Sequence, residues 1–404
     1  MKKTNFKLKT KVLNRAVSIT ALLLAAGLLF TGCPQKVKEE PKPVYYTVNL
    51  VHEGGSLTAA PAIQDGKALK DSEITFTAIP ANASTHEVDK WEITGGQVVS
   101  GGEDESISVK VKITANTTVK VTFKKKDTVP TDKTCTVGAV GFTMKGIAAV
   151  DASLGHNDYN NNKPHTVSLS AYLIGETEVT QELWQAVMGN NPSHFNGSPA
   201  VGETQGKRPV ENVNWYHAIA FCNKLSIKLG LEPCYTVRVG GNPVDFAALS
   251  FDQIPIYYNA DWNKAELDIN KKGFRLPTEA EWEWAAKGGT DDKWAGTDTE
   301  AELTNYAWYG SNGGFETHEV KKKSPNGYGL YDMSGNVWDW CWDWKGDLPA
   351  SLEADYAGPA SGSDRVVRGG SWGNSAIGCT VGLRGDFSPD IRCSYLGFRL
   401  ACRP

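Results

Sequence analysis

The chain has 404 residues, of which 42 are lysine or arginine and 46 are aspartate or glutamate, giving a formal net charge of −4 at pH 7. Residues 1–32 contain six of the basic residues and no acidic one, so the rest of the chain carries 36 basic against 46 acidic side chains, a net charge of −10. This balance argues against a nucleic-acid partner, which requires a basic surface. The length exceeds that of one ordinary domain, so we expect at least two.

The N-terminus has the features of a targeting segment. Basic residues precede an apolar run over 16–30, which is too short for a comfortable membrane span. A Thr-Gly pair and Cys33 follow, as in a bacterial lipoprotein signal peptide, here covering residues 1–32. Acylated Cys33 would then anchor the mature chain to a membrane, at the outer membrane or cell surface, without spanning it. The alternatives are an ordinary secretory signal and an uncleaved anchor.

A small β domain is expected after the N-terminal segment. Residues 33–43 are rich in proline and charge and predict a flexible tether. Residues 44–125 contain four segments in which apolar and polar side chains alternate, at 45–51, 74–78, 107–113 and 118–123. This domain resembles the repeat modules of bacterial surface proteins, such as the internalin B-type repeat, which implies a spacer. Residues 126–136 are predicted to be a linker.

The remaining residues, 137–404, combine short helices with much irregular chain. Apolar residues at helical spacing predict three helices, over 180–188, 213–229 and 278–287. At the third, Thr278 and Glu281 match a capping box, and two glycines follow the last turn. The chain has 13 tryptophans, so aromatic side chains are expected to supply much of a core with little regular structure.

Four sequence blocks form a frame in the last third of the chain. They read FRLPTEAEWEWAAKGG (274–289), NGYGLYDMSGNVWDW (326–340), RVVRGGSW (365–372) and LGFRLACRP (396–404). In order and density they resemble the formylglycine-generating enzyme family, whose members share a sulfatase-modifying-factor domain, and the resemblance covers about residues 137–404. It implies an α+β, C-type-lectin-like fold with long loops on one face. It also implies a copper-dependent oxidase that converts a cysteine of sulfatases to formylglycine.

The insert between the last two blocks, Gly373–Tyr395, departs from the oxidase pattern. Oxidases of this family place two cysteines here, and the soft thiolates hold Cu(I) between them. In this chain the first position is Asn374, and only the second, Cys379, is a cysteine. An amide cannot replace a thiolate ligand, so we expect neither copper nor a catalytic residue. Cys379 would then be buried or disulfide-bonded, and nearby Cys393 is either its partner or a second ligand.

The same resemblance implies a structural calcium site in the turn before the tryptophan-rich strand. Asp332 and Asp339 would supply side chains, while Gly335 and Val337 would supply backbone carbonyls. Carboxylate and carbonyl oxygens are the ligands that Ca²⁺ prefers. The alternative is a solvated or capped turn without a cation.

The resemblance also implies one disulfide. Family members link positions comparable to Cys222, on the second predicted helix, and to a cysteine near the C-terminus. In this chain the C-terminal cysteine is Cys402, two residues beyond the family's position, which keeps it on the same face of a strand. We therefore expect a Cys222–Cys402 disulfide.

The composition of the insert is unusual, because it contains no Lys, Glu, Gln, Met or Trp. Substituting only the adenines of an AAC or AAT asparagine codon reaches Gly, Ser, Ile, Asp, Phe, Cys, Val and Leu but none of those five. Diversity-generating retroelements mutate adenines in this way, and the chain resembles their targets among spirochaete surface lipoproteins. The alternative is an ordinary non-catalytic paralogue whose insert happens to be small and polar.

These observations predict a surface-tethered lipoprotein that binds an unknown protein or glycan through the insert. The candidate contact residues are Asn374, Ile377, Val381, Leu383, Asp386, Phe387, Asp390 and Ile391. A fixed framework lets such side chains change without unfolding the core. The expected buried supports are Trp372, Leu396, Phe398 and Leu400, and Arg384 and Arg392 are candidate supports within the insert. The rival function is the copper-dependent oxidase.

Overall fold

The structure is a computed structural model that describes residues 42–404 except 82, 84–85, 104–105 and 126–128. It divides into two units, Met1–Val44 and Tyr45–Pro404. The predicted signal peptide, the acylation site Cys33 and most of the tether lie outside the described residues. Within the described part of the chain, no helix combines the length and the apolar character needed to cross a membrane.

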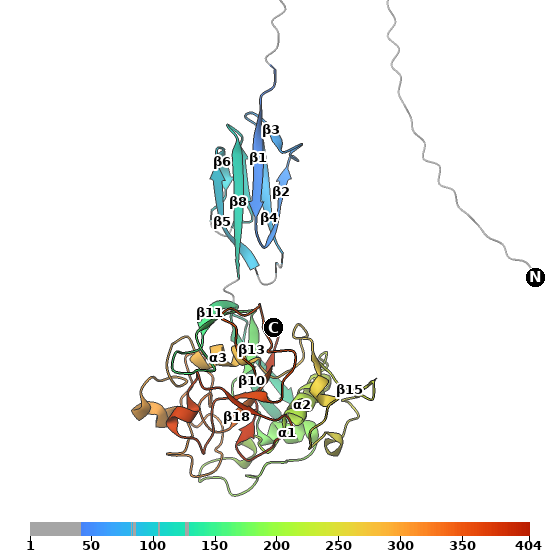
Figure 1. Cartoon of the computed structure of the whole chain (residues 1–404), viewed down its shortest axis with the longest axis vertical. Helices are drawn as coiled ribbons and strands as arrows, with labels where there is room; N and C mark the ends of the chain where they lie inside the picture. Colours follow the sequence, from blue (N-terminus) through green and yellow to red (C-terminus); the bar gives the residue numbers. More distant parts are fainter. Residues whose placement is uncertain (1–41, 82, 84–85, 104–105, 126–128) are drawn as a thin grey trace, which may run out of the picture. The chain divides into compact units, whose positions relative to one another are not determined.

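Residues 45–125 form a β domain of two four-stranded sheets (Figure 1). One sheet has the strand order β3-β1-β8-β5 and the other β2-β4-β7-β6. The strands are β1 (Tyr45–His52), β2 (Gly55–Ala60), β3 (Lys67–Leu69), β4 (Glu73–Pro80), β5 (His86–Thr94), β6 (Gln97–Gly101), β7 (Ser108–Lys112) and β8 (Thr117–Lys125). Strands β1 and β8 pair in parallel, and the other neighbours pair antiparallel.

The two sheets of the β domain share one apolar core. Alternate residues of β4 and β7, including Phe76 and Val111, pack against Val119 and Val121 of β8. This is the expected consequence of period-two alternation, which sends every second side chain to the same face. The four predicted strands are confirmed as β1, β4, β7 and β8, whereas β2, β3, β5 and β6 were missed.

The C-terminal domain, described over 129–404, contains two four-stranded sheets with the orders β22-β13-β10-β9 and β20-β19-β18-β21. Three two-stranded sheets accompany them, β11-β12, β14-β17 and β15-β16. The strands are β9 (Lys133–Val137), β10 (Val140–Ile147), β11 (Val150–Leu154), β12 (His165–Leu169), β13 (Tyr172–Gly175), β14 (Tyr235–Thr236), β15 (Arg238–Val239), β16 (Asn242–Pro243), β17 (Glu266–Leu267), β18 (Trp338–Trp344), β19 (Arg365–Arg368), β20 (Gly385–Phe387), β21 (Leu396–Gly397) and β22 (Ala401–Cys402). Strand β9 begins inside the segment predicted to be a linker.

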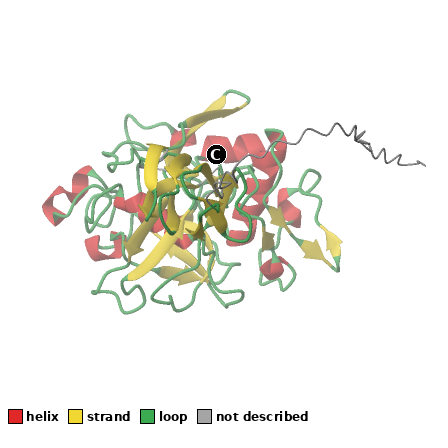
Figure 2. Ribbon diagram, turned by 90° about the horizontal axis from the view of Figure 1, so that it is seen from above, coloured by secondary structure: helices red, strands yellow, loops and turns green. Residues whose placement is uncertain are grey.

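The three predicted helices are present as α1 (Gln181–Met188), α2 (Trp215–Lys228) and α3 (Glu279–Lys287). At α3, the Thr278 hydroxyl accepts from the Glu281 N–H while the Glu281 carboxylate accepts from the Thr278 N–H, and Gly288 ends the helix with a φ of 61°. Short 3-10 helices add η1 (Gln205–Lys207), η2 (Phe251–Gln253), η3 (Trp262–Lys264), η4 (Glu300–Asn305) and η5 (Ala376–Cys379). Figure 2 shows how much of the chain is loop between these short elements.

Aromatic side chains fill the core of the C-terminal domain, as the sequence predicts. Trp184 stacks on Phe221 with ring centroids 5.1 Å apart, and Phe398 meets both rings edge-on. All three side chains are fully buried. Large rings supply the buried area that long helices and strands would otherwise provide, and this packing holds the loops that carry the insert.

Candidate functional site

The insert is attached to one sheet of the C-terminal domain through its middle and immediately after its last residue. Within it, β20 pairs antiparallel with β19, which places Phe387 opposite Arg365. Just after it, β21 pairs in parallel with β18 through Leu396 and Trp338. Between the RVVRGGSW block and β20, the chain forms η5 and a turn. The insert is therefore an ordered part of the fold and has a defined backbone path.

The eight candidate contact residues differ in side-chain exposure: three are exposed, four are half-buried and one is buried. Ile377 and Ile391 are 54% and 41% exposed, and Asp386 is exposed as well. The half-buried candidates are Asn374, Leu383, Phe387 and Asp390. We use the name insert face for six of the eight residues: Asn374, Ile377, Asp386, Phe387, Asp390 and Ile391.

Val381 is only 4% exposed, so the prediction of an exposed contact is wrong at this position. Its backbone N–H donates to the Lys293 carbonyl. Its side chain joins an apolar cluster with Trp282 and Val366. A small polar insert gives no local sign that one of its residues packs against segments much earlier in the chain.

The frame below the insert is buried largely as expected. Leu396, Phe398 and Leu400 are buried. Trp372 differs from the prediction because it is only half-buried. Its indole N–H donates to the Ser394 carbonyl, and its ring meets that of Phe195 at 5.6 Å. Trp372 therefore connects the start of the insert to its end and remains partly open to solvent.

Arg384 is a buried support, whereas Arg392 is exposed. The Arg384 guanidinium donates from Nε and Nη2 to the two carboxylate oxygens of Glu279, both at 2.6 Å. Burial alone would raise the pKa of Glu279, but the guanidinium groups of Arg384 and Arg368 outweigh it and hold this pKa below its usual value. The pair ties the middle of the insert to the first turn of α3.

The two positions at which the family resemblance implies copper ligands are occupied by Asn374 and Cys379. The Asn374 Oδ1 accepts a hydrogen bond from the Ser371 hydroxyl at 2.7 Å. Cys379 is a fully buried free thiol, and burial raises its pKa to about 12. The chain therefore has one buried cysteine at this place instead of a pair. Cys393 is also a free thiol, so the disulfide alternative for Cys379 is not realised.

The predicted Cys222–Cys402 disulfide is absent, because both residues are buried free thiols. Cys402 lies on β22 opposite Leu173 of β13. Both cysteine side chains pack into the main apolar cluster of the C-terminal domain. The free Cys402 thiol is packed as a small apolar group, and its burial raises its pKa to about 12.

The turn that carries the predicted calcium ligands is buried and strained. Asp332 and Asn336 both have a φ of 56°, and Gly335 has a φ of 86°. The Asp332 Oδ2 accepts from the Lys321 N–H at 3.0 Å. The Asp339 Oδ2 accepts from the Trp282 indole at 2.9 Å and from the Arg399 Nε at 2.6 Å. The turn thus aligns both carboxylates within the core.

Each of these two carboxylates keeps one buried oxygen without a hydrogen-bond partner, Oδ1 of Asp332 and Oδ1 of Asp339. Among the described residues, no group of three or more His, Cys, Asp or Glu side chains could hold a metal. A cation here would therefore need backbone carbonyls, such as those of Gly335 and Val337, as further ligands. Two unpartnered carboxylate oxygens and carbonyls suit Ca²⁺ better than a soft metal.

Glu178 is a buried acid near this turn that the sequence analysis missed. Both of its carboxylate oxygens lack a hydrogen-bond partner. Burial, reinforced by the charges of Asp332 and Asp339, raises the pKa of Glu178 well above its usual value, although Arg399 opposes the shift. A lone glutamate between a threonine and a valine carries no local signal of such an environment.

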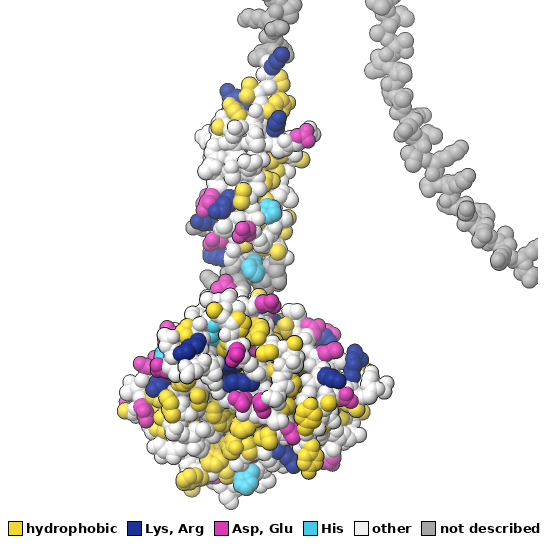
Figure 3. Space-filling view, viewed as in Figure 1, with side chains coloured by type: hydrophobic (Ala, Val, Ile, Leu, Met, Phe, Trp, Pro, Cys, Tyr) yellow, Lys and Arg dark blue, Asp and Glu magenta, His cyan; other side chains and the backbone are white. Residues whose placement is uncertain are grey.

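A second group of exposed residues near the insert was also missed. Tyr257 is 77% exposed, and its neighbours Ile256 and Tyr258 are exposed too. The start of α2 joins their loop to the insert, because the Asn214 side chain donates to the Pro255 carbonyl and the Trp215 N–H donates to the Pro389 carbonyl. Figure 3 shows apolar side chains gathered on the lower part of the C-terminal domain, over the region labelled β18 and α1 in Figure 1.

The chain is similar to several known proteins. A family model described as "Sulfatase-modifying factor enzyme 1-like domain" matches residues 120–404. The solved structure titled Treponema denticola variable protein 1 is 81% identical, covers 68% of this chain and 100% of that chain, and gives a TM-score of 0.68. Chaperone protein LppX of Paenibacillus barcinonensis is 35% identical over 241 residues, 55% of this chain and 76% of that protein.

The formylglycine-generating enzyme of Streptomyces coelicolor is 38% identical over 163 residues, 35% of this chain. The match spans 51% of that enzyme's own length.

Proposed function

The chain belongs to the sulfatase-modifying factor enzyme 1-like family, and from this premise we propose that it is a non-catalytic member that binds a protein ligand through the insert face. The observation that carries the proposal is the contrast within the insert. Side chains such as Ile377 and Ile391 are exposed, while Arg384 and Val381 hold the same segment to the core. Side chains on such a support can change without disturbing the fold.

The residue at the first cysteine position argues against the oxidase. Copper held between two thiolates requires two cysteines that can lose their protons. Asn374 offers an amide that already accepts a hydrogen bond, which leaves Cys379 as the one cysteine at the two positions. A role in binding is also in keeping with the similarity to a protein named as a chaperone.

The character of the exposed side chains favours a protein ligand over a glycan. Ile377, Ile391 and Ile256 offer aliphatic surface, and Tyr257 and Tyr258, which follow Ile256 in the chain, are exposed too. Large apolar and tyrosine side chains dominate the centres of protein–protein contacts. Glycan binding would instead call for a dense set of polar groups around an aromatic platform.

The similarity to a structure titled as a variable protein supports diversification of the insert. The insert lacks the five residue types that adenine substitution of an asparagine codon cannot reach. A lipid on Cys33 would tether the molecule to a membrane and leave the C-terminal domain at the cell surface.

Sequencing the 3′ end of the gene across a cell population tests diversification. Adenine-dependent substitutions should fall on codons of the insert face and spare Leu396, Phe398 and Leu400. A reverse transcriptase gene and a near-identical template repeat should lie nearby. An insert that is invariant across the population, without such a neighbour, would contradict this part of the proposal.

Two display libraries test the binding surface itself. One randomises the six positions of the insert face. The matched library randomises six exposed apolar positions of the β domain, Tyr45, Leu50, Val51, Leu69, Val98 and Val99. Panned against one purified globular protein, the first should yield folded binders and the second none. Equal enrichment from both libraries would overturn the assignment of the insert face.

A direct assay tests the rival activity. The protein is loaded with Cu(I) and incubated in air with a cysteine-containing sulfatase peptide and a thiol reductant, which supplies the two further electrons that reduction of O₂ requires. Mass spectrometry should find the peptide unchanged. Formylglycine that forms with the native protein and disappears with Cys379→Ser would establish catalysis and end the non-catalytic proposal.

We also propose that Asp332 and Asp339 hold a structural Ca²⁺ with the carbonyls of Gly335 and Val337. The support is the pair of buried carboxylate oxygens that have no hydrogen-bond partner. An unsatisfied buried acceptor is costly, and a bound cation would remove that cost. The ion would stabilise the turn before β18.

A further inference from the structure

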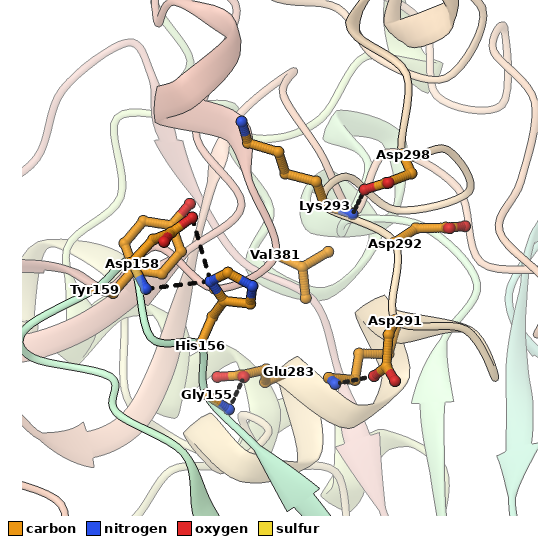
Figure 4. A pocket seen from close by; sticks show the side chains of 12 residues that line it. Gly155, His156, Asp158, Tyr159, Glu283, Asp291, Asp292, Lys293, Asp298 and Val381 are labelled. Atoms are coloured by element: carbon orange, nitrogen blue, oxygen red, sulfur yellow. Dashed lines mark hydrogen bonds and ion pairs between the residues drawn. The ribbon is translucent and has the colours of Figure 1, made fainter.

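A cavity of about 270 Å³ lies beside the insert. Three segments bound it: the loop after β11, the end of α3 with the loop that follows, and insert residues Val381 and Gly382 (Figure 4). No residue of the insert face is among the described residues that line it. The cavity is therefore a second place at which the insert can meet a ligand.

The wall that the insert contributes is preformed. The hydroxyls of Tyr159 and Thr380 are 2.6 Å apart and share a hydrogen bond. The Tyr159 ring packs so closely on Gly382 that a Cβ there would lie 2.7 Å from a ring carbon. The bond from the Val381 N–H to the Lys293 carbonyl ties the opposite wall to the insert. The cavity thus has a fixed shape without a ligand.

Glu283 lines the cavity, but its charge is already balanced. Its Oε1 accepts from the Gly155 N–H at 2.7 Å, and its Oε2 accepts from the Asn162 side chain at 2.9 Å. The buried Arg368 guanidinium also donates to Oε2. Glu283 therefore shapes the cavity and leaves recognition of charge to other residues.

One ion pair and one histidine–carboxylate contact lie within the rim of the cavity. The Lys287 ammonium is 2.5 Å from the Asp291 carboxylate. The His156 Nδ1 is 3.4 Å from the Asp158 carboxylate and also accepts from the Asp158 N–H, so His156 adds positive charge only when protonated. Neither contact gives the rim a net positive charge.

Apart from Glu283 and the Lys287–Asp291 pair, the lining holds three carboxylates, those of Asp158, Asp292 and Asp298, and one ammonium, that of Lys293. Asp158 lies beside His156, while Asp292 accepts from the Thr290 hydroxyl and Asp298 accepts from the Lys293 N–H. The Lys293 ammonium lies over the Trp294 ring, 4.9 Å from its centre. Figure 4 shows Asp158 on one side of Val381 and Asp292 and Asp298 on the other. A cation entering between them is flanked by negative charge, and a cleft with low-dielectric walls strengthens such a field.

We infer that this cavity receives the side chain of a lysine or arginine of the protein ligand. Its methylene stem contacts Val381 and the Tyr159 ring, and its charged group is held between the carboxylates on either side. Long basic side chains combine an apolar stem with a charged end in this way. The inference rests on the proposed binding function and adds an anchoring point to it.

Val381 would then contact the ligand as well as pack against the core. It belongs to the insert, yet it faces the cavity and not the exposed surface. A change at 381 would alter the space available for the stem, while changes on the insert face would alter the surrounding contacts. Diversification of the insert would then tune two parts of the ligand separately.

The test uses two small probes with the full chain. Nα-acetyl-L-lysine N-methylamide carries the ammonium, and Nα-acetyl-L-norleucine N-methylamide has the same stem without it. Titration followed by NMR should show saturable shifts with the lysine probe only. In a triple variant, Asp158→Asn, Asp292→Asn and Asp298→Asn, the Kd should rise about tenfold or more. Val381→Leu, which narrows the cavity, should also weaken binding.

A matched triple variant serves as the control. Asp252→Asn, Asp268→Asn and Asp347→Asn remove the same charge from exposed positions outside the cavity and should leave probe binding unchanged. Equal binding of the two probes, no binding of the lysine probe, or an unaffected Kd in the first triple variant would overturn the inference. So would binding of the free diamine cadaverine without the lysine probe. None of these outcomes changes the result expected from the display-library test, so the two proposals can fail independently.

Discussion

Arg384 and Glu279 lie 105 positions apart in the sequence, yet they form a two-point contact inside the protein. The sequence analysis names both Arg384 and Arg392 as candidate supports of the insert and does not distinguish between them. The structure separates them, because only Arg384 reaches a buried carboxylate. A partner so distant in the chain leaves no trace in local sequence.

Replacing Arg384 by Met should lower the free energy of unfolding by about 3–5 kcal/mol, because the Glu279 carboxylate would remain buried without its nearest counter-charge. Arg392→Met removes the same charge from an exposed side chain and should cost less than about 0.5 kcal/mol. Urea unfolding of both variants measures the difference. Similar costs would refute the assignment of Arg384 as the support.

Glu211 should make stability depend on pH. Burial raises its pKa from 4.5 to about 7, although backbone N–H groups of Phe195 and His194 oppose the shift. The folded protein then holds this proton to higher pH than the unfolded chain does. The contribution of Glu211 to the free energy of unfolding is therefore fully present below pH 4.5. It declines between pH 4.5 and 7 and is lost above pH 7.

The variant Glu211→Gln has no such proton to lose, so its stability should fall less across this range, by up to about 3 kcal/mol. Urea unfolding between pH 4.5 and 7.5 measures the slope. Glu232→Gln, at a largely exposed position paired with Lys271, should keep the slope of the parent protein. Parallel profiles for Glu211→Gln and the parent would show that Glu211 titrates normally.

Among the secondary-structure elements, helices were predicted to within two residues and half of the β domain was missed. Helix ends depend on neighbours in the chain, as with the cap formed by Thr278 and Glu281. Strand β5 was missed because a register shift between Val88 and Lys90 interrupts its alternation. Strand β6 lies at a sheet edge with Val98 and Val99 both exposed, so it has no buried face to leave a pattern.

The insert and its frame should respond differently to truncation. Ile377→Ala and Asp386→Ala change exposed side chains and should each cost less than about 0.5 kcal/mol. Phe398→Ala leaves a cavity against Trp184 and Phe221 and should cost about 3–5 kcal/mol. A chemical-unfolding series provides the comparison. If the insert positions proved as costly as Phe398, the insert would be structural core and unsuited to variation.

For the molecule as a whole, the α+β fold and the family were predictable, because motif blocks and core tryptophans are local in sequence. The exposure pattern of the site was only partly predictable. Val381 was predicted to be an exposed contact residue but is buried. Tyr257 is exposed near the insert but was not predicted. Exposure is decided by which distant segments cover a residue, as Lys293 and Trp282 cover Val381.

Calcium removal should destabilise the whole C-terminal domain. At a free Ca²⁺ concentration about 100 times its Kd, binding adds about 2.7 kcal/mol, which corresponds to a Tm shift of about 5–10 °C. Chelation by EDTA should reverse the shift. Asp332→Asn should abolish the calcium dependence, while Asp252→Asn, at an exposed position, should retain it. A Tm that changes neither on adding calcium nor on adding EDTA would exclude an ion at this turn.

The pairing of β20 with β19 and of β21 with β18 has a further consequence for how the insert can change over time. Because β20 and β21 are both registered in one sheet, exposed side chains of the insert can change while the strand-paired residues keep their positions. Adding or removing a residue within β20 would shift its pairing with β19 by one position and turn its side chains to the opposite face. Relatives that share this frame should therefore differ in length only in the loops on either side of β20.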